Sequence, residues 1–138
     1  MSQENVEVVR RLIHAANERD PDAFVAHLHP DVEWVETGDV LPGLRGTYRG
    51  RAEVREWFRE AFLEAWDDTD HQIEVEEATE GRDGAVLMEL HLSAVGRTSG
   101  VKTELRVWNV AWFQGDRIGR RRVFWTREEA LEAVGLSE

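Results

Sequence analysis

The pattern of apolar and polar positions predicts helices in the first half of the chain and mainly strands in the second. Apolar residues recur with the helical period over residues 2–18. A short second helix is predicted after Asp20 and Pro21, an N-cap followed by proline at the first helical position. The strongest helical pattern covers residues 51–66, where apolar side chains repeat every three or four positions along one face.

After the third helix the period changes from 3.6 to 2, which is typical of strands. The sequence VEWVET predicts one earlier strand. Alternating apolar residues predict four later strands, near residues 73–75, 86–92, 105–113 and 123–125. The turn sequences EGRDG, GRTSG and QGD lie between these later strands and predict an antiparallel meander. Thr126 and Glu129 predict the N-terminus of a last short helix, which Gly135 ends.

This order of elements predicts an α+β fold in one domain, residues 1–138. We expect a curved, mixed, mainly antiparallel sheet that wraps around the long helix as a cone. Such a cone encloses a pocket. The glycine- and proline-rich segment 38–50 is predicted to be a loop, with at most a brief extended piece near Thr47 and Tyr48.

The composition limits which partners the protein is expected to bind and in which compartment it is expected to occur. The formal net charge of -11 opposes binding to a nucleic-acid backbone, because like charges repel. The chain has no cysteine, which excludes disulfides and thiolate chemistry. No stretch approaches the roughly 18 apolar residues of a membrane span, and the N-terminus lacks the apolar core of a signal peptide. We therefore expect a cytoplasmic protein with no membrane partner.

Several stretches resemble the SnoaL-like branch of the nuclear transport factor 2-like superfamily, and the resemblance covers nearly the whole chain. They are ENVEVVRR, HPDVEW, GTYRGRAEVREWF, SGVKTELRV and REEALEAVGL. The resemblance implies a cystatin-like, ketosteroid isomerase-like cone. It does not select an activity, because the superfamily contains isomerases, epoxide hydrolase-like enzymes, cyclases and pocketed proteins without known chemistry.

Glu36 is the first candidate for chemistry. The resemblance matches it to the carboxylate that transfers a proton in ketosteroid isomerases. The alternative is a solvated glutamate at a strand end. Glu33 lies an odd number of residues away, so strand alternation predicts that it points to the opposite face and into water.

Asn109 interrupts the apolar face of a strand that we expect to be central. A polar side chain there needs a hydrogen-bond partner, either within the protein or on a ligand. The resemblance matches it to the protonated aspartate of the isomerase oxyanion hole, and an amide can donate a similar hydrogen bond. Leu12, however, stands where the isomerases have a tyrosine hydroxyl, so the resemblance does not imply steroid isomerase activity.

Arg121 is the third candidate, because alternation places it on one face with Val123 and Trp125. An inward arginine needs a carboxylate, which Glu36 can supply as a structural ion pair or as part of a substrate site. The alternative is a solvated strand carrying three arginines. The epoxide hydrolase-like branch flanks its arginine with carboxylates, and a second one is present here only if Glu89 faces inward.

Aromatic and aliphatic side chains are candidates for the walls of the pocket. We expect a small lipophilic ligand to contact five of them, although they can equally be plain core: Leu12, Trp34, Trp57, Phe58 and Trp125. Trp108 and Trp112 share the opposite face of the strand that carries Asn109. They predict an exposed apolar patch and a homodimer formed through it.

The histidines do not predict a metal site. His27 and His29 lie across a helix end without a third ligand at a recognisable spacing, and His14 is expected on a polar helix face. Glu89 and His91 share a strand face opposite Met88, Leu90 and Leu92, so they lie outside the cone if that aliphatic face lines it. A bulge or a one-residue slip of register would reverse this assignment. We therefore expect neither a metal nor an organic cofactor.

Three functions remain open. The first is an isomerase, cyclase or hydrolase that works by proton transfer, with Glu36 as the base and Asn109 and Arg121 stabilising negative charge. The second is a non-catalytic small-molecule binding or dimeric interaction module. The third is a structural dimerisation domain whose cone is filled by tryptophan.

Overall fold

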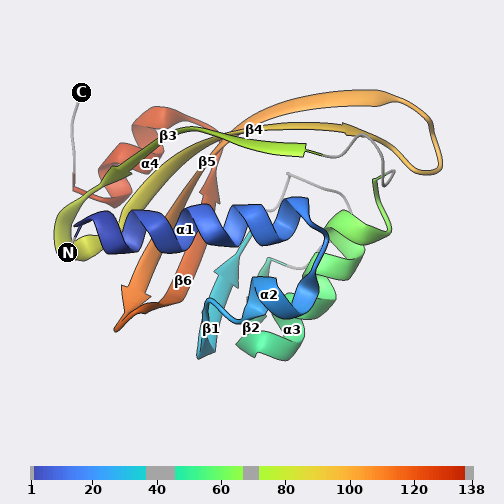
Figure 1. Cartoon of the computed structure of the whole chain (residues 1–138). Coiled ribbons are helices and arrows are strands. Elements are labelled where there is room, and N and C mark those ends of the chain that lie inside the picture. Colours follow the sequence, from blue (N-terminus) through green and yellow to red (C-terminus); the bar gives the residue numbers. More distant parts are fainter. Residues whose placement is uncertain (1, 37–45, 67–71, 136–138) are drawn as a thin grey trace.

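The computed structural model describes residues 2–36, 46–66 and 72–135, and Figure 1 shows a curved sheet with helices packed on it. The helices are α1 (Ser2–Asn17), α2 (Pro21–Val25), α3 (Gly50–Phe58) and α4 (Arg127–Ala133). The strands are β1 (Leu28–Val35), β2 (Thr47–Arg49), β3 (Gln72–Glu80), β4 (Val86–Val95), β5 (Lys102–Gln114) and β6 (Arg117–Phe124). The predicted α+β fold class is confirmed.

Within these described ranges, six strands form one sheet in the order β2-β1-β6-β5-β4-β3. Only the pairing of β1 with β6 is parallel, so the sheet is mixed and mainly antiparallel, as predicted. The parallel pairing places Glu33 opposite Arg120 and Trp34 opposite Arg121, although these residues are far apart in the chain. This pairing positions the polar residues described below.

We call the face of the sheet that α1 and α3 cover the inner face. In Figure 1, α1 crosses the sheet and α3 lies near β1 and β2, and their main contacts are with β3 and β1, respectively. Asn17, the last residue of α1, fixes the edge strand through both backbone groups of Ile73. It accepts from the Ile73 N–H at 2.7 Å and donates to the Ile73 carbonyl at 2.8 Å.

The predicted helix over residues 51–66 is not a single α-helix. The α-helical part ends at Phe58, and Arg59–Leu63 form a π-helical turn, with a 2.9 Å hydrogen bond from Glu64 N–H to the Arg59 carbonyl. The sheet therefore curves around α1 and α3 together, rather than around one long helix. None of the described helices is long and apolar enough to cross a membrane.

The opposite, outer face of the sheet carries α4. Thr126 caps this helix by accepting from Glu129 N–H at 3.2 Å, and Gly135 follows it at φ 73°, as the sequence predicts. Trp108 and Trp112 pack half-buried against the apolar cluster beneath α4. The expected exposed tryptophan patch is therefore partly covered, because α4 folds back over this face.

Most of the predicted loop over residues 38–50 lies outside the described residues. Its last part includes Thr47–Arg49, which form β2 beside β1. The expected brief extended piece is thus present, and it adds an edge strand to the sheet.

Candidate functional site

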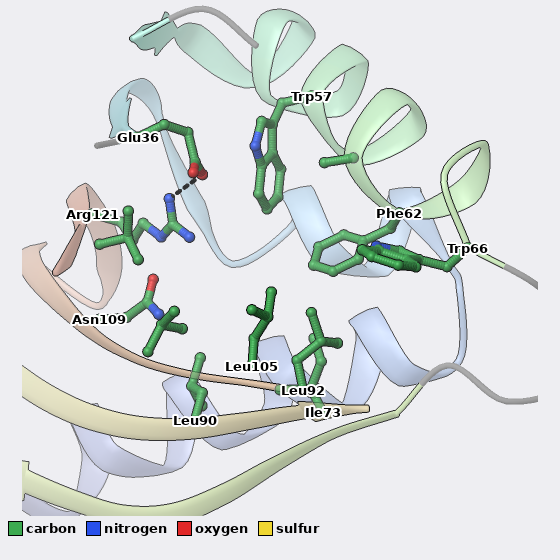
Figure 2. Close-up of a pocket in the computed structure, with 13 residues that line it drawn as sticks. Glu36, Trp57, Phe62, Trp66, Ile73, Leu90, Leu92, Leu105, Asn109 and Arg121 are labelled. Atoms are coloured by element: carbon green, nitrogen blue, oxygen red, sulfur yellow. Dashed lines mark hydrogen bonds and ion pairs between the residues drawn. The ribbon is translucent and has the colours of Figure 1, made fainter. Parts of the chain in front are cut away.

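An apolar cavity of about 80 Å³ lies between the inner face of the sheet and the end of α3 (Figure 2). A single buried water needs roughly 10–15 Å³ of such space, so the cavity has room for a small organic group. Its apolar lining consists of Trp57, Ala61, Phe62, Trp66, Ile73, Leu90, Leu92, Leu105, Val107 and Val123. Its polar lining consists of Glu36, Asn109 and Arg121.

Strand alternation points the side chains of Asn109 and Arg121 from the sheet toward the cavity. Asn109 pairs with Met88 on one side and Val123 on the other, while Arg121 pairs with Ala111. Alternate residues of these strands therefore face the cavity together. Glu89 faces outward, where it accepts a 3.2 Å hydrogen bond from Trp108 Nε1, so it is not a second carboxylate in the cavity.

A buried ion pair joins Arg121 to Glu36. Arg121 Nη1 donates to Glu36 Oε1 at 2.6 Å, and the two side chains are only 10% and 6% exposed. Glu36 follows β1 directly, and its backbone N–H donates to the Gly46 carbonyl at 2.8 Å. A charge-assisted hydrogen bond of this length compensates two charges that would otherwise be costly to bury.

Tryptophan rings cover the charged group on the cavity side. The Arg121 guanidinium carbon lies 4.4 Å from the ring centroid of Trp34 and 5.3 Å from that of Trp57. The faces of indole rings attract cations, so this packing stabilises the guanidinium without a second carboxylate. The site thus combines a balanced ion pair with two tryptophan rings that are tilted by 57° to each other.

Asn109 lies next to the ion pair in Figure 2 and is 3% exposed. No hydrogen bond between residues that the structure describes engages its side chain. Buried amides normally have hydrogen-bond partners. Its amide donor and acceptor thus have no partner within the part of the chain that the structure describes.

The model of the SnoaL-like domain family matches residues 9–121. The chain belongs to this family. Similar solved structures agree with the assignment at the level of the fold. A comparison with curated proteins finds no match.

Three of these solved structures cover almost the whole of this SnoaL-like domain. One is a protein from Catenulispora acidiphila with a ketosteroid isomerase-like fold, in complex with trimethylamine: 15% identity, TM-score 0.73, 95% of this chain and 94% of that chain. TerC, co-crystallised with polyporic acid, has 20% identity and a TM-score of 0.76 over 95% and 97% of the two chains. The epoxide hydrolase/cyclase-like enzyme SalBIII has 23% identity and a TM-score of 0.73 over 91% and 92%.

The other residues that we expected to line the pocket of this SnoaL-like domain do not all line the larger cavity. Leu12 and Trp34 line an adjoining cavity of about 40 Å³, which shares Trp57, Asn109 and Arg121 with the larger one. Phe58 is fully buried in the core and lines neither cavity.

The prediction for Trp125 is wrong. Trp125 is 38% exposed and lines neither cavity. The reason is that β6 ends at Phe124, so the alternation that places Arg121 and Val123 inward no longer applies to the next residue.

Sequence reasoning missed the wall formed by Phe62 and Trp66. Their helical spacing identifies them as apolar, but not as cavity residues. Tertiary contacts hold this wall: Arg97 Nη2 donates to the carbonyls of Leu63 at 2.9 Å and Trp66 at 3.1 Å. Trp66 also forms a β-bridge with Gly96, which connects the wall to the end of β4.

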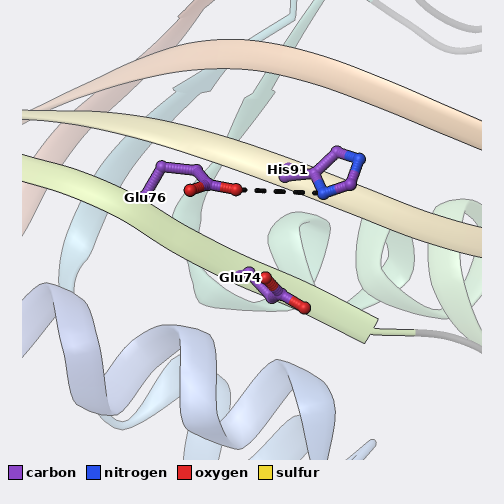
Figure 3. A group of neighbouring side chains, drawn as sticks. All are labelled: Glu74, Glu76 and His91. Atoms are coloured by element: carbon purple, nitrogen blue, oxygen red, sulfur yellow. Dashed lines mark ion pairs between the residues drawn. The ribbon is translucent and has the colours of Figure 1, made fainter.

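Ligand-type side chains also meet on the outer face, away from the cavity. Glu74, Glu76 and His91 each place one ligand atom within 4.8 Å of the others (Figure 3). The sequence pattern does not reveal this group, because it depends on the pairing of Glu74 with His91 and on the bulge at Glu76. Both carboxylates are exposed, and exposed acidic groups commonly gather without a metal, so we assign no metal role to them.

Proposed function

We propose that this SnoaL-like domain binds a small lipophilic molecule and acts on it by proton transfer, as an isomerase, cyclase or hydrolase without an organic cofactor. One observation carries the proposal: Glu36, Asn109 and Arg121 converge from separate segments on one otherwise apolar cavity. A largely apolar pocket with a few convergent polar groups is the usual form of a small-molecule site.

In this proposal Glu36 is the general base. Oε1 accepts the hydrogen bond from Arg121. In this proposal Oε2, which has no hydrogen-bond partner among the described residues, takes a proton from the bound molecule. Arg121 and the amide of Asn109 stabilise the negative charge that then develops on the substrate. In the isomerases that the chain resembles, a tyrosine hydroxyl helps to stabilise this charge. Leu12 stands at that position and has no hydroxyl, so in this proposal Arg121 and Asn109 stabilise the charge without it.

Two structural neighbours support the proposed class of ligand and reaction. SalBIII is an epoxide hydrolase/cyclase-like enzyme with a role in pyran ring formation, and TerC was co-crystallised with polyporic acid. By analogy of fold, a cyclisation or ring-opening reaction on a compact organic substrate suits the cavity.

The test compares Glu36→Gln with Glu33→Gln, a matched change on the outer face. Two reactions are followed by NMR: deuterium exchange beside the carbonyl of small cyclic ketones, and opening of cyclohexene oxide. We expect the wild-type protein and Glu33→Gln to accelerate at least one reaction, and Glu36→Gln to lose at least about 100-fold. Equal rates in all three proteins would remove Glu36 from the mechanism.

A non-catalytic binding module is the second candidate function. The observation that favours it is the 2.6 Å bond between Glu36 and Arg121, which satisfies both groups without a substrate. In that case the protein binds lipophilic compounds but accelerates neither reaction.

We also propose that two copies associate through the outer face around Trp112, as a dimeric interaction module requires. Arg120 lies 5.1 Å from the Trp112 ring centroid, so this face offers both a cation and an aromatic surface. Sedimentation of Trp112→Lys tests this proposal: a dimer in the wild type and a monomer in the variant are expected. A monomeric wild type contradicts it.

A further inference from the structure

Two buried indole N–H groups, in rings that line the two cavities, have no hydrogen-bond partner among the described residues. The two donor atoms are Nε1 of Trp34 and Nε1 of Trp57. These two residues are only 2% and 4% exposed, respectively. Buried polar groups are normally hydrogen-bonded, and an indole N–H can only donate. Whatever satisfies these groups must therefore be a hydrogen-bond acceptor.

Both donors belong to rings that surround the Glu36–Arg121 pair. The ring centroids of Trp34 and Trp57 are 5.0 Å apart, and both rings contact the guanidinium of Arg121. Figure 2 shows the indole nitrogen of Trp57 on the ring edge that faces Glu36. Both tryptophans line the smaller cavity, together with Asn109, and Trp57 also lines the larger one. The two unsatisfied donors thus belong to rings that line the cavities beside the polar groups.

The charge balance of the site indicates which acceptor fits. The positive charge of Arg121 is already paired with Glu36 at 2.6 Å. An anionic ligand would leave one negative charge unpaired in an apolar cavity, which is unfavourable. A neutral carbonyl oxygen satisfies the donors and leaves the net charge unchanged.

We propose that the indole N–H groups of Trp34 and Trp57 select a neutral ligand that carries a carbonyl oxygen. A ligand of this kind is expected to bind more tightly than a hydrocarbon of the same shape and more tightly than a carboxylate. This inference rests on the proposed binding function and names the chemical class of its ligand. It assigns the two tryptophans a hydrogen-bonding role in addition to their role as an apolar wall.

Three compounds of similar size test the selection: acetophenone, ethylbenzene and benzoate. Their affinities are measured by titration, and the indole N–H resonances are followed in ¹H–¹⁵N spectra of the whole chain. We expect acetophenone to bind about tenfold more tightly than the other two, because only it accepts hydrogen bonds without adding charge. We also expect acetophenone alone to shift the indole resonances of Trp34 and Trp57.

Trp34→Phe and Trp57→Phe assign the two resonances and remove one donor each while keeping an aromatic ring. Each is expected to weaken acetophenone binding several-fold and to leave ethylbenzene binding unchanged, and Trp112→Phe on the outer face is the matched control. If a variant fails to fold, the wild-type affinity ratios still decide the question.

The failure of this inference is distinct from that of the proposed function. Equal binding of acetophenone and ethylbenzene, or tightest binding of benzoate, overturns the carbonyl selection while a lipophilic site remains. Indole resonances that do not move when acetophenone binds overturn the hydrogen-bonding role. Binding of none of the three compounds overturns both proposals.

Discussion

Glu33 and Glu36 lie three positions apart at the end of β1, and both pair with an arginine of β6, but on opposite faces of the sheet. On the outer face, Glu33 lies 3.2 Å from Arg120 and 3.5 Å from Arg49, and its side chain is 36% exposed. On the inner face, Glu36 lies 2.6 Å from Arg121, and its side chain is 6% exposed.

The two pairs have the same chemistry in different surroundings. Water screens the outer pair, and such pairs typically contribute only about 0–1 kcal/mol to stability. The inner pair lies against tryptophan rings in a largely apolar cavity, where removing one partner leaves a charge that nothing compensates. Burial, rather than residue type, therefore separates a solvated ion pair from a candidate site.

The largest expected effect comes from Arg121→Met, which keeps most of the side-chain volume and removes the cation. Because the carboxylate of Glu36 then remains buried without its partner, we expect a loss of about 3–5 kcal/mol in the free energy of unfolding. Urea denaturation measures this loss. A loss below about 1 kcal/mol would show that the inner pair is solvated like the outer one.

Combining Glu36→Leu with Arg121→Met sharpens the comparison further. With both charges absent, we expect most of the lost stability to return, since apolar residues of similar volume often replace buried pairs without cost. A double-mutant cycle should therefore give a coupling energy of at least about 3 kcal/mol. Additive effects of the two single changes would contradict a direct interaction.

Arg120→Met is the matched change on the outer face. We expect a loss of at most about 1 kcal/mol, and we expect it to disappear in about 1 M salt, where the Debye length is only about 3 Å. The loss caused by Arg121→Met should persist in the same salt. If salt reduced the loss of stability equally in both variants, the inner and outer ion pairs would be equally screened by solvent.

The smallest expected effect is the contribution of His27 to the pH dependence of stability. This histidine is half-buried and lies near Arg11. Burial lowers the pKa of His27 from its ordinary value of 6.5, and the positive charge of Arg11 lowers it further. The unfolded chain therefore takes up this proton at a higher pH than the folded protein, and stability falls as the pH drops through 6.5.

Urea midpoints between about pH 7.5 and pH 5.5 test this dependence. His27→Gln should flatten part of the slope, whereas His14→Gln, at a well-exposed position on α1, should not. An unchanged slope in His27→Gln would exclude this histidine as a source of the pH dependence.

Much of the fold and part of the site could be predicted from local patterns. The change of period from 3.6 to 2 located the helices and strands. Alternation predicted that Glu33 points into water and that Arg121 shares a face with Val123, but it left open whether that face is the inner one. Predictions were wrong where local periodicity stopped. Trp125 follows the end of β6, and the helix after Phe58 widens into a π-helical turn.

Long-range contacts decided the rest. The outer tryptophans are half-buried because α4 returns over the sheet, and no local pattern of residues near Trp108 contains that information. The group formed by Glu74, Glu76 and His91 likewise depends on the pairing of β3 with β4 and on its bulge.

The sequence by itself determined the α+β class and the family resemblance, because periodicity and alternation are local properties of a chain. It proposed Glu36, Asn109 and Arg121 as site residues but left open whether Glu36 and Arg121 face the pocket or water. Only the tertiary structure decided that Glu36 bonds to Arg121. It also decided that, among the described residues, Asn109 has no side-chain partner and two indole N–H groups have no acceptor. These features arise from the parallel pairing of β1 with β6 and from the packing of α3 against β1. Distances across a sheet depend on which strands meet, and hydrogen-bond satisfaction depends on every atom nearby.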